Sequence, residues 1–252
     1  MIKLDNNKKK NRDIRKLLIK IPLLPDVYRM LRRAYAYYRL NGRDAEDIFT
    51  DIFKKNKWGG KESVSGIGSE LQHTKVIISE VQILLRELGI KSMLDIPCGD
   101  FNWMRHLDLN GIQYTGADIV EELITLNTTK YEASGISFKK LNLIRDELPV
   151  AELIICRDCL VHLSFRDIFC SLKNISESRS KYLLTTTYSD RKINRDIYTG
   201  QWHSLNLEMA PFFLPRPIKI IKEYRMLPDG TITDKSLGLW NIDQIRESLK
   251  SC

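Results

Sequence analysis

The sequence predicts an α/β protein built on a mostly parallel β-sheet, and three observations lead to that prediction. From residue 91 onward, short apolar stretches alternate with helical patterns, as they do where helices cover both faces of a parallel sheet. One apolar stretch, residues 91–96, carries Asp95 and runs straight into a tight turn. A second one, residues 114–117, leads directly into Asp118.

Length and charge favour one α/β domain preceded by a basic extension. At 252 residues with 43% hydrophobic residues, a single α/β domain can bury a sufficient core. The net charge of +8 is unevenly spread along the chain. Residues 1–43 hold 13 Lys/Arg and 3 Asp, whereas the rest of the chain holds 27 Lys/Arg and 29 Asp/Glu. The body of the protein is therefore nearly neutral, which argues against a nucleic-acid partner.

Residues 1–43 form the predicted extension. Residues 1–13 are polar and basic and are predicted to be disordered, and a helix is expected from Asp26 to Asn41-Gly42. Its apolar and arginine-rich faces suit peripheral contact with an anionic membrane or a lipid-linked substrate, but they equally suit docking on the protein itself. Residues 17–25 are apolar but are interrupted by a lysine and two prolines. No signal peptide or membrane span is expected, so the predicted location is the cytoplasm, with the inner membrane face as the peripheral alternative.

Residues 44–90 are predicted to form a helical cap. Helices are expected over 44–55 and 70–88, the second one stopped by Gly89. The loop 58–69 between them holds four glycines and three serines. That composition suits a segment that closes over a ligand, and it also suits a plain linker.

Residues 91–252 are predicted to form the catalytic domain. Residues 137–142 are expected to form a third strand and the turn that follows it, further strands are expected over 152–156 and 182–187, and Ser164 begins a capping box for the helix after the fourth strand. Residues 188–217 are predicted to be loop-rich. The stretches 218–225 and 231–240 flank a Pro-Asp-Gly turn and predict a C-terminal antiparallel hairpin, followed by a last helix over 241–250.

The turn after residue 96 indicates which cofactor the strand ends can bind. A strand, a close turn, a helix and a second strand tipped with a carboxylate form a site for a ribose, because the carboxylate can accept from two neighbouring hydroxyls. Dinucleotides need several glycines beside the pyrophosphate, whereas this turn has Gly99 alone and an acid, Asp100. Asp95 and Asp100 suit a positively charged nucleoside such as S-adenosylmethionine (SAM).

These residues resemble the first motif of class I SAM-dependent methyltransferases, and the resemblance extends over residues 90 to 245. It implies a Rossmann-like three-layer sandwich with a ribose-binding acid at Asp118 and an adenine-contacting turn around Asn142. Pro97 and Phe101 stand where most members have glycine, and Asn142 stands where they have Asp. The stretches 58–69, 95–104 and 156–163 also resemble a subgroup found in bacterial surface-polysaccharide and small-molecule gene clusters. The residues expected to bind the cofactor are Asp95, Pro97, Cys98, Gly99, Phe101, Asp118, Ile119, Asn142 and Arg157.

Two histidines are candidates for a general base. His162 is the first, because it follows the fourth strand and has an ordinary pKa suited to proton abstraction at neutral pH. Asp158 is expected to orient or replace His162, and His203 is the second candidate. The alternative for His162 is simple packing against the following helix. The residues expected to contact the acceptor are Arg157, Tyr188, Trp202 and Asn206.

No metal is expected at this site. Cys156 and Cys159 have a zinc-like spacing, but only His162 lies near them and no second cysteine pair follows, so buried apolar thiols are the favoured interpretation. Asp158, Asp190 and Asp196 are too scattered for a divalent-ion site.

The expected function is SAM-dependent O-methylation of a sugar, a glycan or a phosphate-bearing intermediate. No Asn-Pro-Pro-Tyr-type motif follows the fourth strand, which argues against methylation of an adenine or glutamine amino group. Two alternatives remain open: a small-molecule O- or N-methyltransferase, and a non-catalytic SAM- or nucleoside-binding partner subunit.

Overall fold

A computed structural model describes residues 31, 34, 37–223 and 233–250 of the chain. It divides into two compact units, Met1–Gly42 and Arg43–Cys252. In the first unit the described residues 31, 34 and 37–40 are helical, as the sequence predicts. The basic start and most of the amphipathic helix predicted from Asp26 lie outside the described residues.

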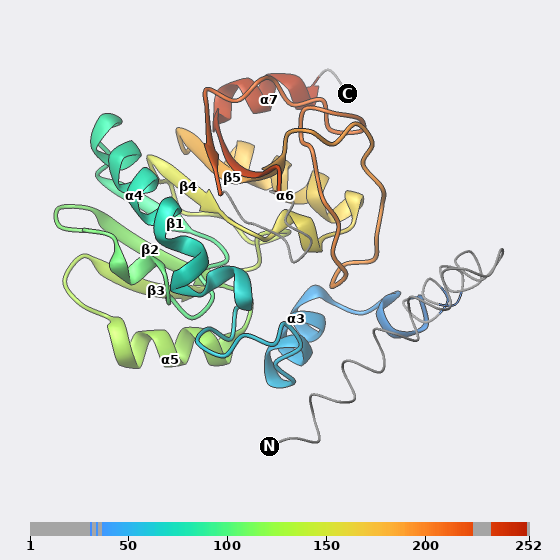
Figure 1. Cartoon of the computed structure of the whole chain (residues 1–252), viewed down its shortest axis with the longest axis horizontal. Coiled ribbons are helices and arrows are strands. Elements are labelled where there is room, and N and C mark those ends of the chain that lie inside the picture. The colour runs from blue at the N-terminus through green and yellow to red at the C-terminus, as the bar shows by residue number, and fades with distance from the viewer. Residues whose placement is uncertain (1–30, 32–33, 35–36, 224–232, 251–252) are drawn as a thin grey trace. The chain divides into compact units, whose positions relative to one another are not determined.

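The second unit is built on a seven-stranded sheet in the order β3-β2-β1-β4-β5-β7-β6 (Figure 1). The strands β1 to β5 pair in parallel, whereas β7 is antiparallel to both β5 and β6. This confirms the predicted mostly parallel sheet with a C-terminal antiparallel hairpin, although the tip of that hairpin lies outside the described residues. The strands are β1 (Ser92–Asp95), β2 (Gln113–Asp118), β3 (Ile136–Lys140), β4 (Leu153–Cys156), β5 (Tyr182–Tyr188), β6 (Lys219–Lys222) and β7 (Lys235–Asn241).

Strand order reverses between β1 and β4, because the chain continues outward from β1 to β2 and β3 and then returns to β4 on the other side. In parallel sheets the loops on either side of such a switch point diverge and leave a crevice at the carboxyl ends of the strands. The fold therefore places the ends of β1, β2 and β4 around one crevice.

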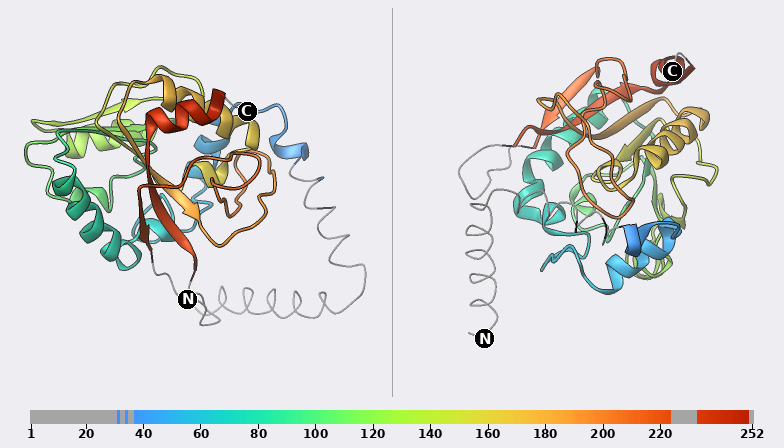
Figure 2. Two further views of the ribbon diagram at one scale, coloured as in Figure 1. Left: turned by 90° about the horizontal axis from the view of Figure 1, so that it is seen from above. Right: turned by 90° about the vertical axis from the view of Figure 1, so that its right-hand side faces the viewer.

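Helices cover both faces of the sheet and give three layers. The helices are α3 (Ala45–Lys54), α4 (Leu71–Glu87), α5 (Glu121–Tyr131), α6 (Phe165–Glu177) and α7 (Ile242–Lys250), with 3₁₀ turns η1 (Ile67–Ser69), η2 (Met104–His106) and η3 (Leu160–His162). Figures 1 and 2 show α4 and α7 on opposite faces of the sheet. None of the described helices is long and apolar enough to cross a bilayer.

Alternate side chains of the strands supply two apolar cores, one on each face. Met93 and Ile155 pack with α4, whereas Leu94, Ile154 and Leu183 pack on the other face with α6 and α7. The helix residues in these cores are fully or almost fully buried; they include Ile77, Val81, Leu84 and Leu85 of α4, Ile168, Leu172 and Ile175 of α6, and Ile242 and Ile245 of α7.

One predicted helix is nearly absent. The sequence interpretation places a helix between the first two strands, but there the structure has only the three-residue turn η2. Trp103, Met104 and Leu107 of this segment are buried in a compact loop. The segment therefore fills the core without the several turns that a helix would need.

The capping prediction for α6 is correct in part. Ser164 is the N-cap, and its Oγ accepts the Asp167 N–H at 3.2 Å. A complete capping box would have the Asp167 carboxylate accept the N–H of Ser164. That carboxylate instead accepts the hydroxyl of Thr199, and the Ser164 N–H donates to Thr199 Oγ1 at 2.9 Å. The long segment after β5 is therefore tied to the start of α6.

Candidate functional site

A cavity of about 370 Å³ lies at the carboxyl ends of the strands around the switch point. It is lined by the turn after β1, the residues after β2, β3 and β4, the loop before α4, and part of α3. Its size falls within the range of small-molecule and cofactor sites, which is roughly 300–1,000 Å³. The sequence predicts that these strand ends meet, and they do.

The turn after β1 is tied to the tip of β2. It contains a cis peptide bond between Ile96 and Pro97, and Gly99 has φ of 55°. The N–H of Gly99 donates to Asp118 Oδ2 at 3.1 Å, and the N–H of Val120 donates to Oδ1 at 3.0 Å. Glycine adopts this left-handed conformation without cost. The two backbone donors thereby fix the orientation of the Asp118 carboxylate in the cavity wall.

Phe101 occupies the left-handed region that glycine would normally fill, with φ of 58°. Its ring is 3% exposed and packs against Tyr114, Tyr131 and Phe138, with ring centroids 5.1 to 5.3 Å apart. Packing of an aromatic cluster therefore compensates for an unfavourable backbone conformation.

Replacing Phe101 with glycine should lower the free energy of unfolding. The loss of a buried aromatic ring costs ~3–5 kcal/mol, whereas relief of the left-handed backbone returns only ~1–2 kcal/mol. We expect a net loss of about 2 kcal/mol in urea denaturation, and Phe101→Ala should lose more because it gains no backbone freedom. A glycine variant more stable than the wild type would show that backbone strain dominates at this position.

Two buried carboxylates face the cavity. Burial raises the pKa of Asp118 to about 6, against the lowering effect of its backbone hydrogen bonds. Burial raises the pKa of Asp95 to about 7, although Asp95 accepts the Tyr114 hydroxyl at 2.9 Å. The ionised form of a buried carboxylate is stabilised by a ligand that brings hydrogen-bond donors or positive charge.

The wall beside Asp118 is apolar and suits a flat ring. Asn142 lies in it, and its Oδ1 accepts the Ile144 N–H at 2.9 Å, which orients the amide. The Asn142 N–H donates in turn to Asp146 Oδ2 at 2.7 Å. The apolar residues of this wall are Ile119, Val120, Leu123, Leu141, Leu143 and Ile144.

Helix α3 contributes Phe49 and Phe53 to the cavity wall. The start of α3 is held by ion pairs to the end of β3 and the segment that follows it: Glu46 with Lys140 at 2.6 Å, and the N-cap Asp44 with Arg145 at 2.6 Å. These contacts place α3 beside the apolar wall. That the segment 44–90 acts as a cap remains a prediction.

The glycine- and serine-rich loop 58–69 lines the cavity and is attached to the turn after β1. Asp100 makes this attachment, because its carboxylate accepts from Ser63 Oγ at 2.9 Å, from the Val64 N–H at 2.9 Å and from Ser65 Oγ at 3.2 Å. Asp100 also lines the cavity, but its oxygens bind this loop, so a direct contact between Asp100 and a charged ligand stays a prediction. Its partners lie 35 to 37 residues upstream, which no local pattern reveals.

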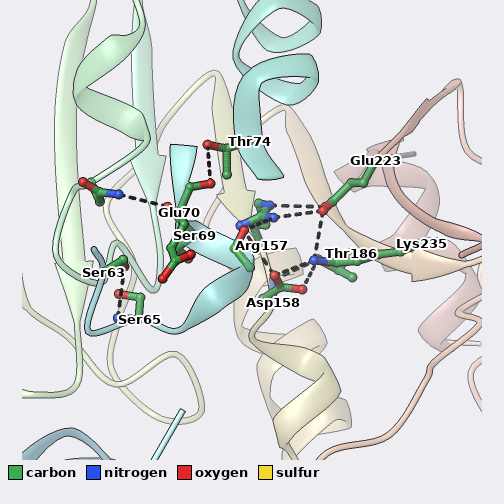
Figure 3. Close-up of polar contacts among 12 residues, drawn as sticks. Ser63, Ser65, Ser69, Glu70, Thr74, Arg157, Asp158, Thr186, Glu223 and Lys235 are labelled. Atoms are coloured by element: carbon green, nitrogen blue, oxygen red, sulfur yellow. Dashed lines mark hydrogen bonds and ion pairs between the residues drawn. The ribbon is translucent and has the colours of Figure 1, made fainter. Parts of the chain in front are cut away.

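A network of four charged side chains lies where β4 and β6 end and β7 begins (Figure 3). Arg157 donates to both Glu223 oxygens, at 3.2 and 2.9 Å, and to the carbonyl of Gly68 at 2.9 Å. Lys235 binds Asp158 Oδ2 at 2.6 Å and Glu223 Oε2 at 2.9 Å. Arg157 lines the cavity, but its guanidinium is already engaged with these partners. Its predicted roles in holding the cofactor and an anionic acceptor are therefore not supported.

Asp158 is unsuited to act as a base. Burial opposes its ionisation, but Lys235 and Arg157 outweigh that effect and hold the pKa of its carboxyl well below the usual range. A general base must take up a proton near neutral pH. The expected role of Asp158 as a replacement for His162 is therefore not supported, because its carboxylate binds Lys235; that Asp158 orients His162 stays a prediction.

His162, on η3, has the geometry of a base. Its Nδ1–H donates to the carbonyl of Gln201 at 2.8 Å, since a carbonyl can only accept, and this leaves Nε2 as the basic nitrogen. Burial lowers the pKa of His162, which keeps the ring neutral at pH 7. The ring lines the cavity and lies 5.3 Å from that of Trp58.

Aromatic side chains surround His162. The rings of Trp58 and Phe49 have centroids 6.4 Å apart, and both residues line the cavity. Tyr188 and Trp202 line it as well, with ring centroids 6.1 Å apart, and Trp202 is 57% exposed. The sequence interpretation includes Tyr188 and Trp202 but gives no role to Trp58.

Two predicted site residues lie outside the cavity lining. His203 is buried, and its Nδ1 pairs with the carbonyl of Arg195 at 2.7 Å. Asn206 is buried too, and its amide donates to the carbonyls of Ser189 and Arg191. Both residues hold the segment after β5 in shape, so the predicted roles as second base and as acceptor contact are not supported.

The described residues contain no group of three or more His, Cys, Asp or Glu side chains placed to hold a metal ion. Cys156 is buried at the end of β4, and Cys159 lies at the cavity wall. Both are free thiols in the described structure.

No family model and no curated protein sequence matches the chain. Solved structures share its fold. A human N-acetylserotonin methyltransferase in complex with SAM superposes on this chain with a TM-score of 0.53 at 16% sequence identity. The match covers 78% of this chain but only 60% of the human chain. A magnesium protoporphyrin IX methyltransferase from Synechocystis with bound SAM superposes with a TM-score of 0.56 at 12% sequence identity, and the match covers 80% of this chain and 98% of that one.

A third structure has the same fold and contains two ligands. It is a 1,6-didemethyltoxoflavin-N1-methyltransferase from Burkholderia thailandensis with 1,6-didemethyltoxoflavin and S-adenosylhomocysteine bound. It superposes with a TM-score of 0.54 at 13% identity, over 77% of this chain and 87% of that one. At these identities the comparisons establish the Rossmann-like fold that these methyltransferases share.

Proposed function

We propose that this chain is a SAM-dependent methyltransferase that methylates a hydroxyl group of a sugar or glycan. The observation that carries the proposal is the Asp118 carboxylate, which Gly99 and Val120 orient at the tip of β2 inside the cavity. A carboxylate in this position can accept hydrogen bonds from two neighbouring ribose hydroxyls. The fold shared with SAM-bound methyltransferases supports the same interpretation.

The donor groups of the cavity fit the proposed cofactor. Asp95 and Asp118 are buried acids with raised pKa values, so hydroxyl donors and positive charge would stabilise their ionised forms. The apolar wall around Leu141 and Leu143 suits an adenine ring, and Asn142 lies within it. When bound, SAM supplies a sulfonium-activated methyl group to an acceptor.

His162 is the residue that we assign as general base. As an acceptor hydroxyl becomes methylated, its proton passes to Nε2 of the neutral imidazole, while Nδ1–H stays bound to the Gln201 carbonyl. That hydrogen bond holds the ring in one orientation, and the tilted ring of Trp58 packs beside it with its centroid 5.3 Å away. Release of the proton to solvent restores the base.

The aromatic residues around His162 support a sugar as the acceptor. Trp58 and Trp202 present flat apolar surfaces to the cavity, and such surfaces pack against the carbon face of a pyranose ring. Trp202 is more than half exposed, which leaves room for an acceptor that continues beyond the cavity. The three solved neighbours act on other kinds of molecule, as their names state, so the acceptor is inferred from this chain alone.

The affinity for S-adenosylhomocysteine, the product form of the cofactor, should rise with pH. In the ligand-free protein the pKa of Asp118 is raised to about 6. Near or below that pH, the protein molecules in which Asp118 is protonated must lose this proton before the carboxylate can accept hydrogen bonds from both ribose hydroxyls. We expect about a tenfold gain in affinity from pH 5 to pH 8 in calorimetric titrations. An Asp118→Asn variant should lose the part of this dependence that Asp118 contributes and keep the part that Asp95 contributes, and an affinity that falls with rising pH would contradict the assignment.

The proposed activity can be tested directly. The full-length protein is incubated with SAM and a panel of mono- and oligosaccharides, and formation of S-adenosylhomocysteine is followed together with the mass of the acceptor. A gain of one methyl group on a hydroxyl of a panel member supports the proposal. Methylation of amines but not of hydroxyls would contradict it, and S-adenosylhomocysteine binding without any turnover would favour a non-catalytic binding subunit.

A further inference from the structure

The charges that line the cavity are unbalanced toward the negative. Among the described lining residues are four carboxylates, Asp95, Asp100, Asp118 and Asp158, and two permanent cations, Arg157 and Lys235. His162 is neutral because burial lowers its pKa. A cationic ligand such as the proposed cofactor is therefore favoured, whereas an anionic ligand meets repulsion.

Both cations already have carboxylate partners. The Arg157 guanidinium is paired with Glu223, and the Lys235 ammonium is paired with Asp158 and Glu223. The side chains of Arg157, Glu223 and Lys235 are 3%, 3% and 7% exposed. Withdrawal of either cation to serve a ligand would leave Asp158 and Glu223 with a single cation between them, which is unfavourable at a buried site.

We infer that the part of the acceptor that enters this cavity carries no negative charge, and that the Asp158–Lys235 pair sets this selectivity against anions. The inference rests on the proposed function and makes it more specific. It disfavours the phosphate-bearing acceptors expected as one class from the sequence. The pair acts by excluding anions. A phosphate or carboxylate group of an acceptor would lose its water on entering the cavity and would lie beside other carboxylates, and it would find no unpaired cation among the described lining residues to compensate.

Asp158 is the position at which this selectivity can be altered. Its side chain is 29% exposed, more than those of its three partners, so its replacement disturbs the buried pairs least. It has φ of 54°, a conformation that asparagine and glycine tolerate well. An Asp158→Asn variant leaves Lys235 with Glu223 alone, so the four-residue network changes from neutral to a charge of +1.

The test compares anion binding by the wild type and by charge variants of the full-length protein. Glucose, glucose 6-phosphate and inorganic phosphate are titrated by calorimetry and by saturation-transfer NMR, with and without S-adenosylhomocysteine. We expect the wild type to prefer glucose over its phosphate. Asp158→Asn should gain about tenfold or more in affinity for the two phosphates and nothing for glucose. Asp243→Asn, which makes the same change of charge on α7 outside the cavity lining, should gain nothing.

Two results would overturn the inference. One is a wild type that binds glucose 6-phosphate more tightly than glucose; the other is an Asp158→Asn variant with no larger gain than Asp243→Asn. If Asp158→Asn unfolds, Asp158→Gly removes the same charge at a backbone conformation that glycine favours. Failure of S-adenosylhomocysteine to bind would count against the proposed function, whereas the titrations without it would still report the charge preference of the cavity.

Discussion

Replacing Asp118 with alanine should lower the affinity for S-adenosylhomocysteine by at least about a hundredfold. Hydrogen bonds to a charged group are worth ~1.5–3 kcal/mol each, and two ribose hydroxyls would lose their acceptor. The variant also releases the N–H groups of Gly99 and Val120, which loosens the turn after β1. Calorimetric titration of the full-length protein measures the change.

Two matched variants make this result specific. Asp118→Asn keeps one oxygen acceptor and should fall between the alanine variant and the wild type. Asp243→Ala removes an exposed carboxylate on α7, outside the cavity lining, and should bind as the wild type does. Unchanged affinity in Asp118→Ala, with the fold retained by circular dichroism, would remove the proposed ribose site.

Replacing His162 with asparagine should lower kcat by about 10²- to 10⁴-fold, the usual contribution of a general base. The asparagine amide can still donate to the Gln201 carbonyl, so the local structure is kept while the basic nitrogen is lost. S-adenosylhomocysteine should bind as it does to the wild type, since His162 is assigned to the acceptor. The measurement is the initial rate on an acceptor identified from the saccharide panel.

His203 provides the comparison for this variant. It is buried outside the cavity lining, so His203→Asn should change the melting temperature more than it changes kcat. If His203→Asn lost as much kcat as His162→Asn while remaining folded, the base would have been assigned to the wrong histidine. A rate close to that of the wild type in His162→Asn would show that proton removal does not limit the reaction.

Much of the fold could be predicted because its signals are local. The central strands β1 and β4 lie in short apolar runs, and the helices 44–55 and 70–88 are predicted within a residue or so of the observed α3 and α4. The exception is the helix expected between β1 and β2. Crossovers of this kind usually hold a helix, but here the buried Trp103 and Met104 pack within a short turn.

The site was predictable where its residues are close in sequence. The turn at Gly99 and the acid Asp118 follow consecutive strands, so the parallel pairing of β1 and β2 alone brings them together. The charged network was not predictable, because Glu223 and Lys235 reach Arg157 and Asp158 only through the antiparallel pairing of β6 and β7 with the rest of the sheet. The predicted site roles of His203 and Asn206, in the segment after β5, are not supported because both side chains bind backbone carbonyls of their own loop. Sequence alone does not reveal these contacts either.

The most direct test of the central claim is a crystal structure of the full-length protein with S-adenosylhomocysteine. The two oxygens of Asp118 should accept the ribose hydroxyls, and the adenine should lie against Leu141 and Leu143. A ligand bound elsewhere, or a ribose that leaves the Asp118 carboxylate untouched, would contradict the claim.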